Sequence, residues 1–122
     1  MAAPYSYGVW VVKAGFEEEF VVRWRDLAEW TATNMPGAGV GRLLQDDDQP
    51  GRFISFGQWE SREAMSGWRS TLGFQERISR LRDLLETFTP ASLELRAEVD
   101  PEVVAPHRPA YVDRQDRRRE HI

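Results

Sequence analysis

The sequence predicts an α+β domain in which helices cover one face of a four-stranded antiparallel sheet. Three observations indicate this class. Some segments have the two-residue periodicity of strands, others carry an apolar stripe at helical spacing, and the segments follow one another as strand, helix, strand, strand, helix, strand. A chain of 122 residues suits one such domain with its own core, followed by a short tail.

The first strand is predicted from Tyr5 to Lys13, where aromatic and β-branched residues predominate. Both of its sides are substantially apolar, so we expect both to be covered in the folded protein. Its alternate residues would face opposite sides of the sheet, with Tyr5, Tyr7, Val9 and Val11 on one side and Ser6, Gly8, Trp10 and Val12 on the other.

A helix is predicted after the break at Ala14-Gly15. The consecutive glutamates Glu17 to Glu19 favour the positive N-terminal end of a helix dipole. The helix should end near Asn34, because Pro36-Gly37 cannot continue it. Its apolar stripe consists of Phe20, Trp24, Leu27, Ala28 and Thr31.

Two antiparallel strands are predicted next, from Val40 to Gln45 and from Arg52 to Trp59. The segment 46–51 between them is Asp-Asp-Asp-Gln-Pro-Gly, which has the composition of a tight turn. We interpret the aspartates as part of a solvated turn. Adjacent carboxylates on one loop tip cannot easily converge on a metal ion without ligands from elsewhere.

The second half of the chain predicts two helices and a last strand. Ser61 should cap a short helix that runs to about Ser70. After Gly73 a longer helix is indicated by the apolar stripe Phe74, Ile78, Leu81 and Leu85. The last strand is indicated by Leu93, Leu95, Ala97 and Val99, which alternate with charged residues.

This order of elements is that of the ferredoxin-like βαββαβ fold, here with its second helix split in two. In the third strand Phe53 and Trp59 would lie on one side, but Ile54 and Phe56 would lie on the other. The helices can cover only one face of the sheet. Because the chain has nothing left to cover the second face, we predict a homodimer joined sheet to sheet, a dimeric α/β barrel.

The domain should comprise residues 1–99, and residues 100–122 should form a C-terminal tail rich in proline and arginine. The prolines and the charged run from Asp113 to Glu120 make a core element unfavourable there. The tail is either disordered or an arm that clasps the partner subunit. Tyr111 and Val112 are its only plausible anchors.

Composition and charge exclude several classes of function. The chain has no cysteine, so disulfides, thiolate catalysis and sulfur-ligated metals are excluded. No N-terminal apolar run is long enough for a signal peptide or a membrane span, so we expect a cytoplasmic protein. The net charge of −4 lies in residues 1–99, because the basic and acidic residues of the tail balance. An acidic body argues against binding to nucleic acid.

Trp59 and Trp68 flank the start of the short helix and indicate a pocket. A large aromatic with an N–H donor is a costly choice on a short surface helix unless the helix roofs a cavity. Any other single aromatic could simply be packed in the core, but Trp68 stands between Gly67 and Arg69. The pocket would lie between the sheet and the helices and would be lined by Gly8, Trp10, Trp24, Trp68, Phe74 and Ile78.

The chain resembles the antibiotic biosynthesis monooxygenase family, whose members are small dimeric α+β barrels. The segment Val12–Phe20 is similar to the family's strand-to-helix junction. The segment Phe53–Ser61, together with Trp68 and Phe74, is similar to its best-marked stretch. The resemblance covers about residues 5–99. It implies the fold, while family members include quinone-forming oxygenases, haem degraders and proteins without known activity.

Two activities of the family can be compared residue by residue. The indole of its haem degraders falls on Trp68, but their iron-ligating histidine falls on Ile78 and their first-strand asparagine on Gly8. Isoleucine cannot ligate iron, so we expect no haem cofactor. The cofactor-free oxygenases of aromatic polyketides also match at Trp68, but their asparagine and tyrosine fall on Ala64 and Phe74.

The resemblance implies an oxidoreductase, namely a cofactor-independent monooxygenase that oxidises a small aromatic, polyketide- or quinol-like substrate with O₂ and no metal. The substrate would react as its enolate or phenolate. Trp68 would be the catalytic N–H donor to the developing oxyanion, and the other five lining residues would bind the substrate. No base is evident: His107 and His121 lie outside the body, which leaves Glu60, Glu63, Glu76, Tyr5 and Tyr7 as candidates.

Other functions are compatible with the same residues. A non-catalytic small-molecule binder or a polyketide cyclase-like protein would need the same fold and pocket. An RNA-recognition module shares the element order, and Arg52–Phe56 loosely resembles its signature. Phe53 and Phe56, however, would face opposite sides of the sheet. We therefore rank RNA recognition below a small-molecule function.

Overall fold

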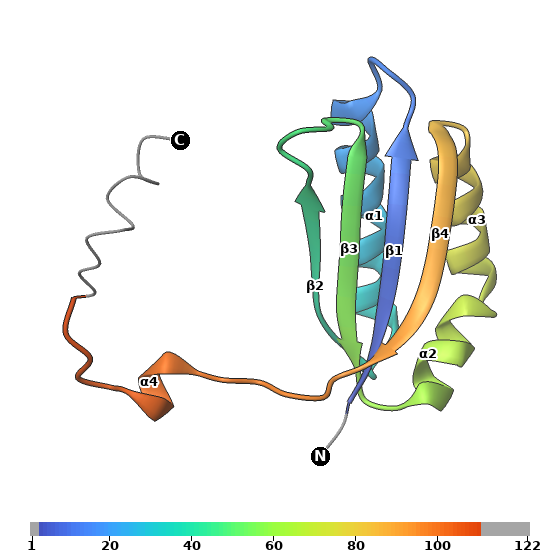
Figure 1. Ribbon diagram of the computed structural model, residues 1–122. Helices are drawn as coiled ribbons and strands as arrows, with labels where there is room; N and C mark the ends of the chain where they lie inside the picture. The colour runs from blue at the N-terminus through green and yellow to red at the C-terminus, as the bar shows by residue number, and fades with distance from the viewer. Residues whose placement is uncertain (1–2, 111–122) are drawn as a thin grey trace.

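The computed structural model describes residues 3–110 and shows the predicted α+β fold (Figure 1). Its elements are β1 (Pro4–Val12), α1 (Glu17–Asn34), β2 (Ala38–Gln45), β3 (Arg52–Trp59), α2 (Arg62–Arg69), α3 (Leu72–Arg82), β4 (Leu85–Glu94) and α4 (Pro101–Val104). The antiparallel strands form one sheet in the order β2-β3-β1-β4, and α1, α2 and α3 lie against one of its faces. This is the ferredoxin-like arrangement, with the second helix split into α2 and α3.

β1 is a central strand and sets the register of the sheet. Gly8 lies opposite Ser55 of β3 on one side and opposite Pro90 of β4 on the other. Trp10 lies in the next row that faces the helices, between Phe53 and Phe88. The strand alternation therefore places small residues in one row and aromatic residues in the next.

Capping hydroxyls separate α2 from α3. Ser61 accepts a hydrogen bond from the Ala64 N–H at 3.0 Å, as the sequence predicted, and Thr71 accepts one from the Phe74 N–H at 3.1 Å. Each hydroxyl satisfies a backbone donor that a helix leaves unpaired in its first turn. Two short helices therefore start where one long helix would have continued.

The position of the last strand was predicted wrongly. β4 runs from Leu85 to Glu94, whereas the alternation of residues predicted a strand from Leu93 to Val99 and placed Leu85 in the preceding helix. Pro90 argues against a strand in a sheet interior, but β4 is an edge strand, where proline is tolerated. A tight turn, in which the Leu84 N–H donates to the Leu81 carbonyl at 2.9 Å, ends the helix early and leaves Leu85 buried.

The core fills one half of the space between the sheet and the helices. Phe20, Phe53 and Leu81 are fully buried there. The ring of Phe20 packs 4.9 Å from that of Phe53 and 5.4 Å from that of Trp10, measured between centroids. We call this region, formed by Trp10, Phe20, Phe53 and Leu81, the filled half.

α1 and α3 approach each other closely at Gly73. A methyl group added at Gly73 would overlap the Trp30 ring, so the contact requires glycine. The Arg77 guanidinium lies 4.9 Å from the centre of the same ring, and its Nε lies 3.2 Å from a carboxylate oxygen of Asp26. Together these contacts hold α1 and α3 against each other above the sheet.

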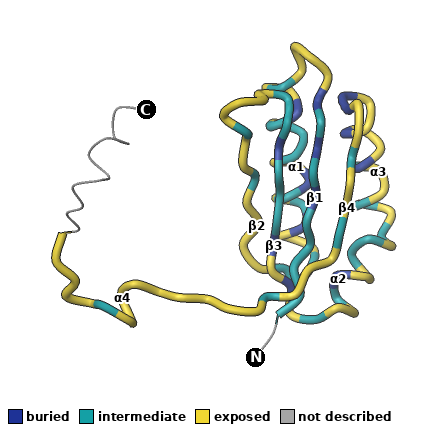
Figure 2. Tube along the Cα trace, in the orientation of Figure 1, coloured by how far each residue is buried: buried dark blue, intermediate teal, exposed yellow. Residues whose placement is uncertain are grey.

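The other face of the sheet is apolar, and none of the elements in residues 3–110 covers it (Figures 1 and 2). Its residues on β1 and β3 are half-buried by one another, while Leu44 and Leu93 at the two edges are 53% and 45% exposed. The apolar and aromatic residues of β1 and β3 on this face are Tyr5, Tyr7, Val9, Val11, Ile54 and Phe56, and Arg52 and Gln58 lie at its two ends.

Beyond β4 the chain leads away from the sheet (Figure 1). The single turn of α4 is capped by Asp100 and buries none of its residues, and Val103 and Val104 are 77% and 70% exposed. Tyr111, Val112 and His121 lie outside the described residues. Within residues 3–110, no helix is long and apolar enough to cross a membrane.

Candidate functional site

A cavity of about 960 Å³ lies between the sheet and the helices, next to the filled half. This volume is near the upper end of the range of small-molecule sites. The floor is formed mainly by Ser6, Gly8, Ser55, Gly57, Pro90 and Ser92 on β1, β3 and β4. The walls and roof are formed mainly by Trp24, Leu27, Thr31, Trp59, Trp68, Arg69, Phe74 and Ile78.

The floor is open because its residues are small. A Cβ atom added at Gly8 would lie 3.0 Å from Phe88 Cε1, 3.1 Å from Trp10 Nε1 and 3.2 Å from Ser55 Oγ. Any side chain at this position would press on the aromatic rings and occupy the cavity. Glycine instead lets Phe88, Trp10 and Ser55 pack directly over the backbone of β1 at the edge of the cavity, where Gly8 is buried.

An aromatic cluster forms one wall. The Trp68 ring lies between two others, 4.8 Å from the Trp59 ring and 4.5 Å from the Phe74 ring, measured between centroids. The second contact is edge-to-face, with an interplanar angle of 62°. Such a cluster offers large, rigid apolar surfaces against which a flat ligand can stack.

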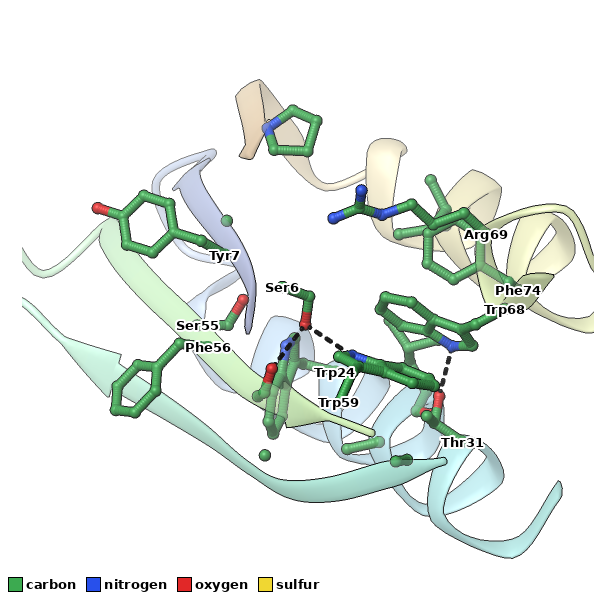
Figure 3. Close-up of a pocket in the computed structure, with 18 of the residues that line it drawn as sticks. Ser6, Tyr7, Trp24, Thr31, Ser55, Phe56, Trp59, Trp68, Arg69 and Phe74 are labelled. Carbon is green, nitrogen blue, oxygen red and sulfur yellow. Dashed lines mark hydrogen bonds between the residues drawn. The ribbon is translucent and has the colours of Figure 1, made fainter. Parts of the chain in front are cut away.

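Three of the four indoles that line the cavity, those of Trp10, Trp59 and Trp68, donate their N–H to a hydroxyl (Figure 3). Trp68 donates to Thr31 at 2.9 Å, and Trp59 donates to Ser6 at 3.2 Å. Trp10 donates to Ser55 at 2.9 Å. A polar N–H in apolar surroundings needs such a partner.

The Trp68 N–H is therefore already engaged and is not available to donate to a ligand oxygen in this structure. We predicted it as the donor to an oxyanion, but it is bonded to Thr31, whose own hydroxyl donates to the Leu27 carbonyl at 2.7 Å. The Trp68 ring lines the cavity all the same.

All six residues that the sequence predicted for the pocket line this cavity. Trp68, Phe74 and Ile78 come from α2 and α3, Trp24 from α1, and Gly8 and Trp10 from β1. The sequence analysis missed Ser55, Thr31 and Arg69. Ser55 could have been found from the alternation of β3, because it lies between the inward-facing residues Phe53 and Gly57.

The candidate bases are placed less favourably. Glu60, Glu63, Glu76 and Tyr5 do not line the cavity. The backbone of Tyr7 borders it, but Figure 3 shows the Tyr7 ring on the far side of the strand from the indoles. His107 is exposed in the segment after β4.

Charged groups also border the cavity. Glu29 and Arg82 are exposed, whereas Arg69 is half-buried. Burial lowers the pKa of the Arg69 guanidinium, because a charged group loses hydration there. No three His, Cys, Asp or Glu side chains in residues 3–110 lie close enough together to hold a metal ion.

The arrangement suits a flat, mostly apolar ligand with a few polar atoms. Aromatic rings provide stacking surfaces, small residues leave space above the strands, and the hydroxyls and the half-buried Arg69 guanidinium are the polar points. Ser55 is notable among the hydroxyls: it accepts the Trp10 N–H, and its own proton has no acceptor among the described residues. It can therefore donate to a ligand oxygen.

A model of the antibiotic biosynthesis monooxygenase family matches residues 8–93. This range contains all six predicted pocket residues and also Thr31, Ser55 and Arg69. No curated protein matches the chain in sequence.

Solved structures share the fold at low sequence identity. A protein from Deinococcus radiodurans has a TM-score of 0.70 and 19% identity, and the match covers 80% of this chain and 96% of that chain. A protein from Shewanella oneidensis has a TM-score of 0.69 and 16% identity, with coverage of 76% and 90%. A variant of SnoaB, a cofactor-independent oxygenase from Streptomyces nogalater, has a TM-score of 0.64 and 20% identity, with coverage of 81% and 95%.

Proposed function

Because the chain belongs to the antibiotic biosynthesis monooxygenase family, we propose that it is a cofactor-independent monooxygenase that oxidises a small aromatic, polyketide- or quinol-like substrate with O₂. The observation that carries this proposal is the cavity of about 960 Å³ with its wall of Trp59, Trp68 and Phe74. The likeness to SnoaB, which is named a cofactor-independent oxygenase, supports the reaction type.

The reaction needs no reactant besides the substrate and O₂. A ring CH₂ flanked by conjugated carbonyl or hydroxyl groups ionises to an enolate, which donates an electron to O₂. The carbon radical and superoxide then combine to a peroxide, and loss of water leaves a carbonyl. One oxygen atom enters the product and the other leaves as water, so CH₂ and O₂ become C=O and H₂O.

The protein would contribute shape, dryness and hydrogen bonds. Trp68 and the rings beside it would hold the substrate plane, while Gly8, Trp10, Trp24 and Ile78 would complete the binding surface. Since the Trp68 N–H is bonded to Thr31, we assign stabilisation of the developing oxyanion to the Ser55 hydroxyl. A substrate acidic enough to ionise unaided needs no base from the protein.

We also propose that the protein is a homodimer joined through the open face of the sheet. The apolar surface around Tyr7, Val9 and Phe56 supports this proposal. Val9→Glu should give a monomer in light scattering, and Val22→Glu, on an exposed part of α1, should not. Residues 1–99 would then be the catalytic domain.

A non-catalytic binder or a cyclase-like protein is the second candidate. Two observations favour it. The Trp68 N–H is already bonded to Thr31, and among residues 3–110 the cavity is lined by a single carboxylate side chain, that of Glu29, which is exposed. A cyclase would give a ring-closed product without consuming O₂.

Oxygen uptake separates the two candidates. Chelator-treated protein would be given 1,8-dihydroxyanthrone and a series of polyhydroxylated naphthalenes, with a protein-free control for spontaneous oxidation. We expect uptake that depends on the protein and that falls at least tenfold in Trp68→Ala. If uptake never exceeds the control while the same compounds quench tryptophan fluorescence, the protein is a binder or a cyclase.

A further inference from the structure

Arg69 differs from the other half-buried arginines of the protein. Arg23, Arg52 and Arg77 each have a carboxylate oxygen close by, at 3.1, 3.1 and 3.2 Å. Among residues 3–110, no carboxylate lies within ion-pair distance of Arg69. Its positive charge is thus partly removed from water without a negative partner.

The Arg69 guanidinium is held in place at the cavity. Its Nη1 donates to Ser92 Oγ at 2.9 Å and its Nη2 to the Ala91 carbonyl at 3.2 Å, which fixes the group between α2 and β4. In Figure 3 the side chain extends into the space beside Phe74 and Trp68. Neutral acceptors occupy only part of the guanidinium, so other N–H bonds are left for a ligand.

These observations indicate an anion site. A partly buried cation without a counter-charge is unfavourable, and an arriving anion would recover the lost electrostatic energy. Arginine is suited to this role because it stays charged at neutral pH and binds carboxylates with paired N–H bonds. The apolar surfaces around it strengthen the interaction.

We propose that Arg69 determines the specificity of the cavity by binding an ionised oxygen of the ligand, either a carboxylate or a phenolate. The inference rests on the proposed function for the aromatic nature of the ligand. The sheet register places Ser92, the anchor of Arg69, on β4, and Ser55 two strands away on β3. Ser92 lies opposite Ser6 and Ser55 lies opposite Gly8, so the two positions are separated by two strand spacings of about 4.8 Å and by two residues of about 3.3 Å each, roughly 12 Å in all. A fused-ring ligand can span this distance, with its anion at Arg69 and a second oxygen at Ser55.

Charge selectivity is the quantity that tests the proposal. The affinities of 2-naphthoate and 2-naphthamide would be measured at neutral pH by quenching of tryptophan fluorescence. The two compounds have nearly the same shape and differ in charge. We expect the wild-type protein to prefer the acid by about tenfold or more. Arg69→Gln should abolish this preference and Arg69→Lys should keep part of it.

Two controls separate anion binding from a structural role. Arg62→Gln removes the same charge from the same helix, but at an exposed position paired with Glu94 at 3.9 Å, and should keep the preference. Ser92→Ala removes one of the two contacts that hold Arg69, and it should lower the affinity for the acid more than that for the amide, so that the preference falls without being lost. Because the preference is a ratio, a general loss of stability in Arg69→Gln would affect both ligands alike.

The assignment is overturned if the wild-type protein binds acid and amide equally, if it binds neither, or if Arg69→Gln retains the preference. Oxygen uptake tests the proposed function separately. Charge preference without uptake would leave the anion site in place and reject the oxygenase. Oxygen uptake without charge preference would support the oxygenase and reject the anion site.

Discussion

The helix-facing side of the sheet consists of two regions built on the same strands. In the filled half, Trp10 of β1 lies beside Phe53 of β3, and their rings fill the space below the helices. One row along, Gly8 lies beside Ser55, and that space remains a cavity. We call this second region, formed by Gly8, Ser55, Gly57 and the rings above them, the hollow half. The comparison shows that the cavity arises from a change in side-chain size at successive inward positions.

The two halves therefore have different tasks. Tight packing in the filled half supplies the apolar burial that stabilises the fold. The hollow half gives up such contacts and keeps polar groups that lack a full set of partners within residues 3–110, namely the hydroxyl proton of Ser55 and the charge of Arg69. A substitution should affect mainly stability in one half and mainly ligand binding in the other.

The largest effect is expected from truncating a ring in the filled half. Phe20→Ala should lower the free energy of unfolding by about 3–5 kcal/mol, because it leaves a closed void where the side chain is 0% exposed. Phe74→Ala, at the cavity, should cost only about 1–2 kcal/mol, since it enlarges a space already open. Urea unfolding of both variants measures the difference. Equal losses would mean that the hollow half is packed as part of the core.

Most of the fold could be predicted from the sequence because its signals are local. The alternation in β1 and the cap at Ser61 involve neighbours along the chain, and both predictions are confirmed. β4 was misplaced because Pro90 hides a strand that only its edge position allows. The apolar and charged residues from Leu93 to Val99 alternate more regularly than those of β4 itself, and this alternation led to the wrong prediction.

The site was predicted only in its apolar part. The apolar side of a predicted helix must face the sheet, and this rule correctly placed Trp24 and Phe74 at the cavity. The polar contacts could not be predicted, because they join distant residues. Trp68 is 37 positions from its acceptor Thr31, and Arg69 is 23 positions from Ser92. No spacing rule along one element relates such pairs.

Filling the hollow half should remove binding and should cost less stability than the loss of a ring from the filled half. Gly8→Val places methyl groups where an added Cβ is already 3.0 Å from Phe88, so affinity for 1,8-dihydroxyanthrone should fall at least thirtyfold, about 2 kcal/mol. The free energy of unfolding should fall by about 1–3 kcal/mol, because the added methyl groups press on buried neighbours. Fluorescence titration and urea unfolding give both values.

Gly67→Ala is the matched control for this substitution. It adds a methyl group on α2, where no atom lies within 4 Å of the added Cβ, and it should leave affinity unchanged. If Gly8→Val binds as well as the wild type, the ligand does not occupy the space above β1, and the hollow half is not the site.

A smaller effect is expected from the hydrogen bond that fixes Trp68. Thr31→Val keeps the side-chain shape but leaves the indole N–H without its acceptor, which should cost about 1–2 kcal/mol of unfolding free energy. Thr33→Val is the control on the same helix, because Thr33 is exposed and bonds only to the Glu29 carbonyl; it should cost about 0.5 kcal/mol or less. Equal losses in thermal or urea unfolding would show that the Trp68 bond is replaceable by water.

The smallest effect should lie outside both halves, at the turn between β2 and β3. There the backbone N–H groups of Asp48 and Gln49 donate to Asp46 at 2.8 and 3.1 Å, and together with Arg52 they hold the pKa of the Asp46 carboxyl below its ordinary value. A depressed folded-state pKa means that the stabilisation is complete above the ordinary carboxyl pKa of about 3.9 and is lost as the pH falls through the lower folded value. Asp46→Asn should therefore remove a small part of the acid dependence of the urea midpoint, while affinity for 1,8-dihydroxyanthrone at neutral pH stays the same. A change in affinity would mean that the turn is coupled to the cavity, and that stability and binding are not divided between the two halves as we infer.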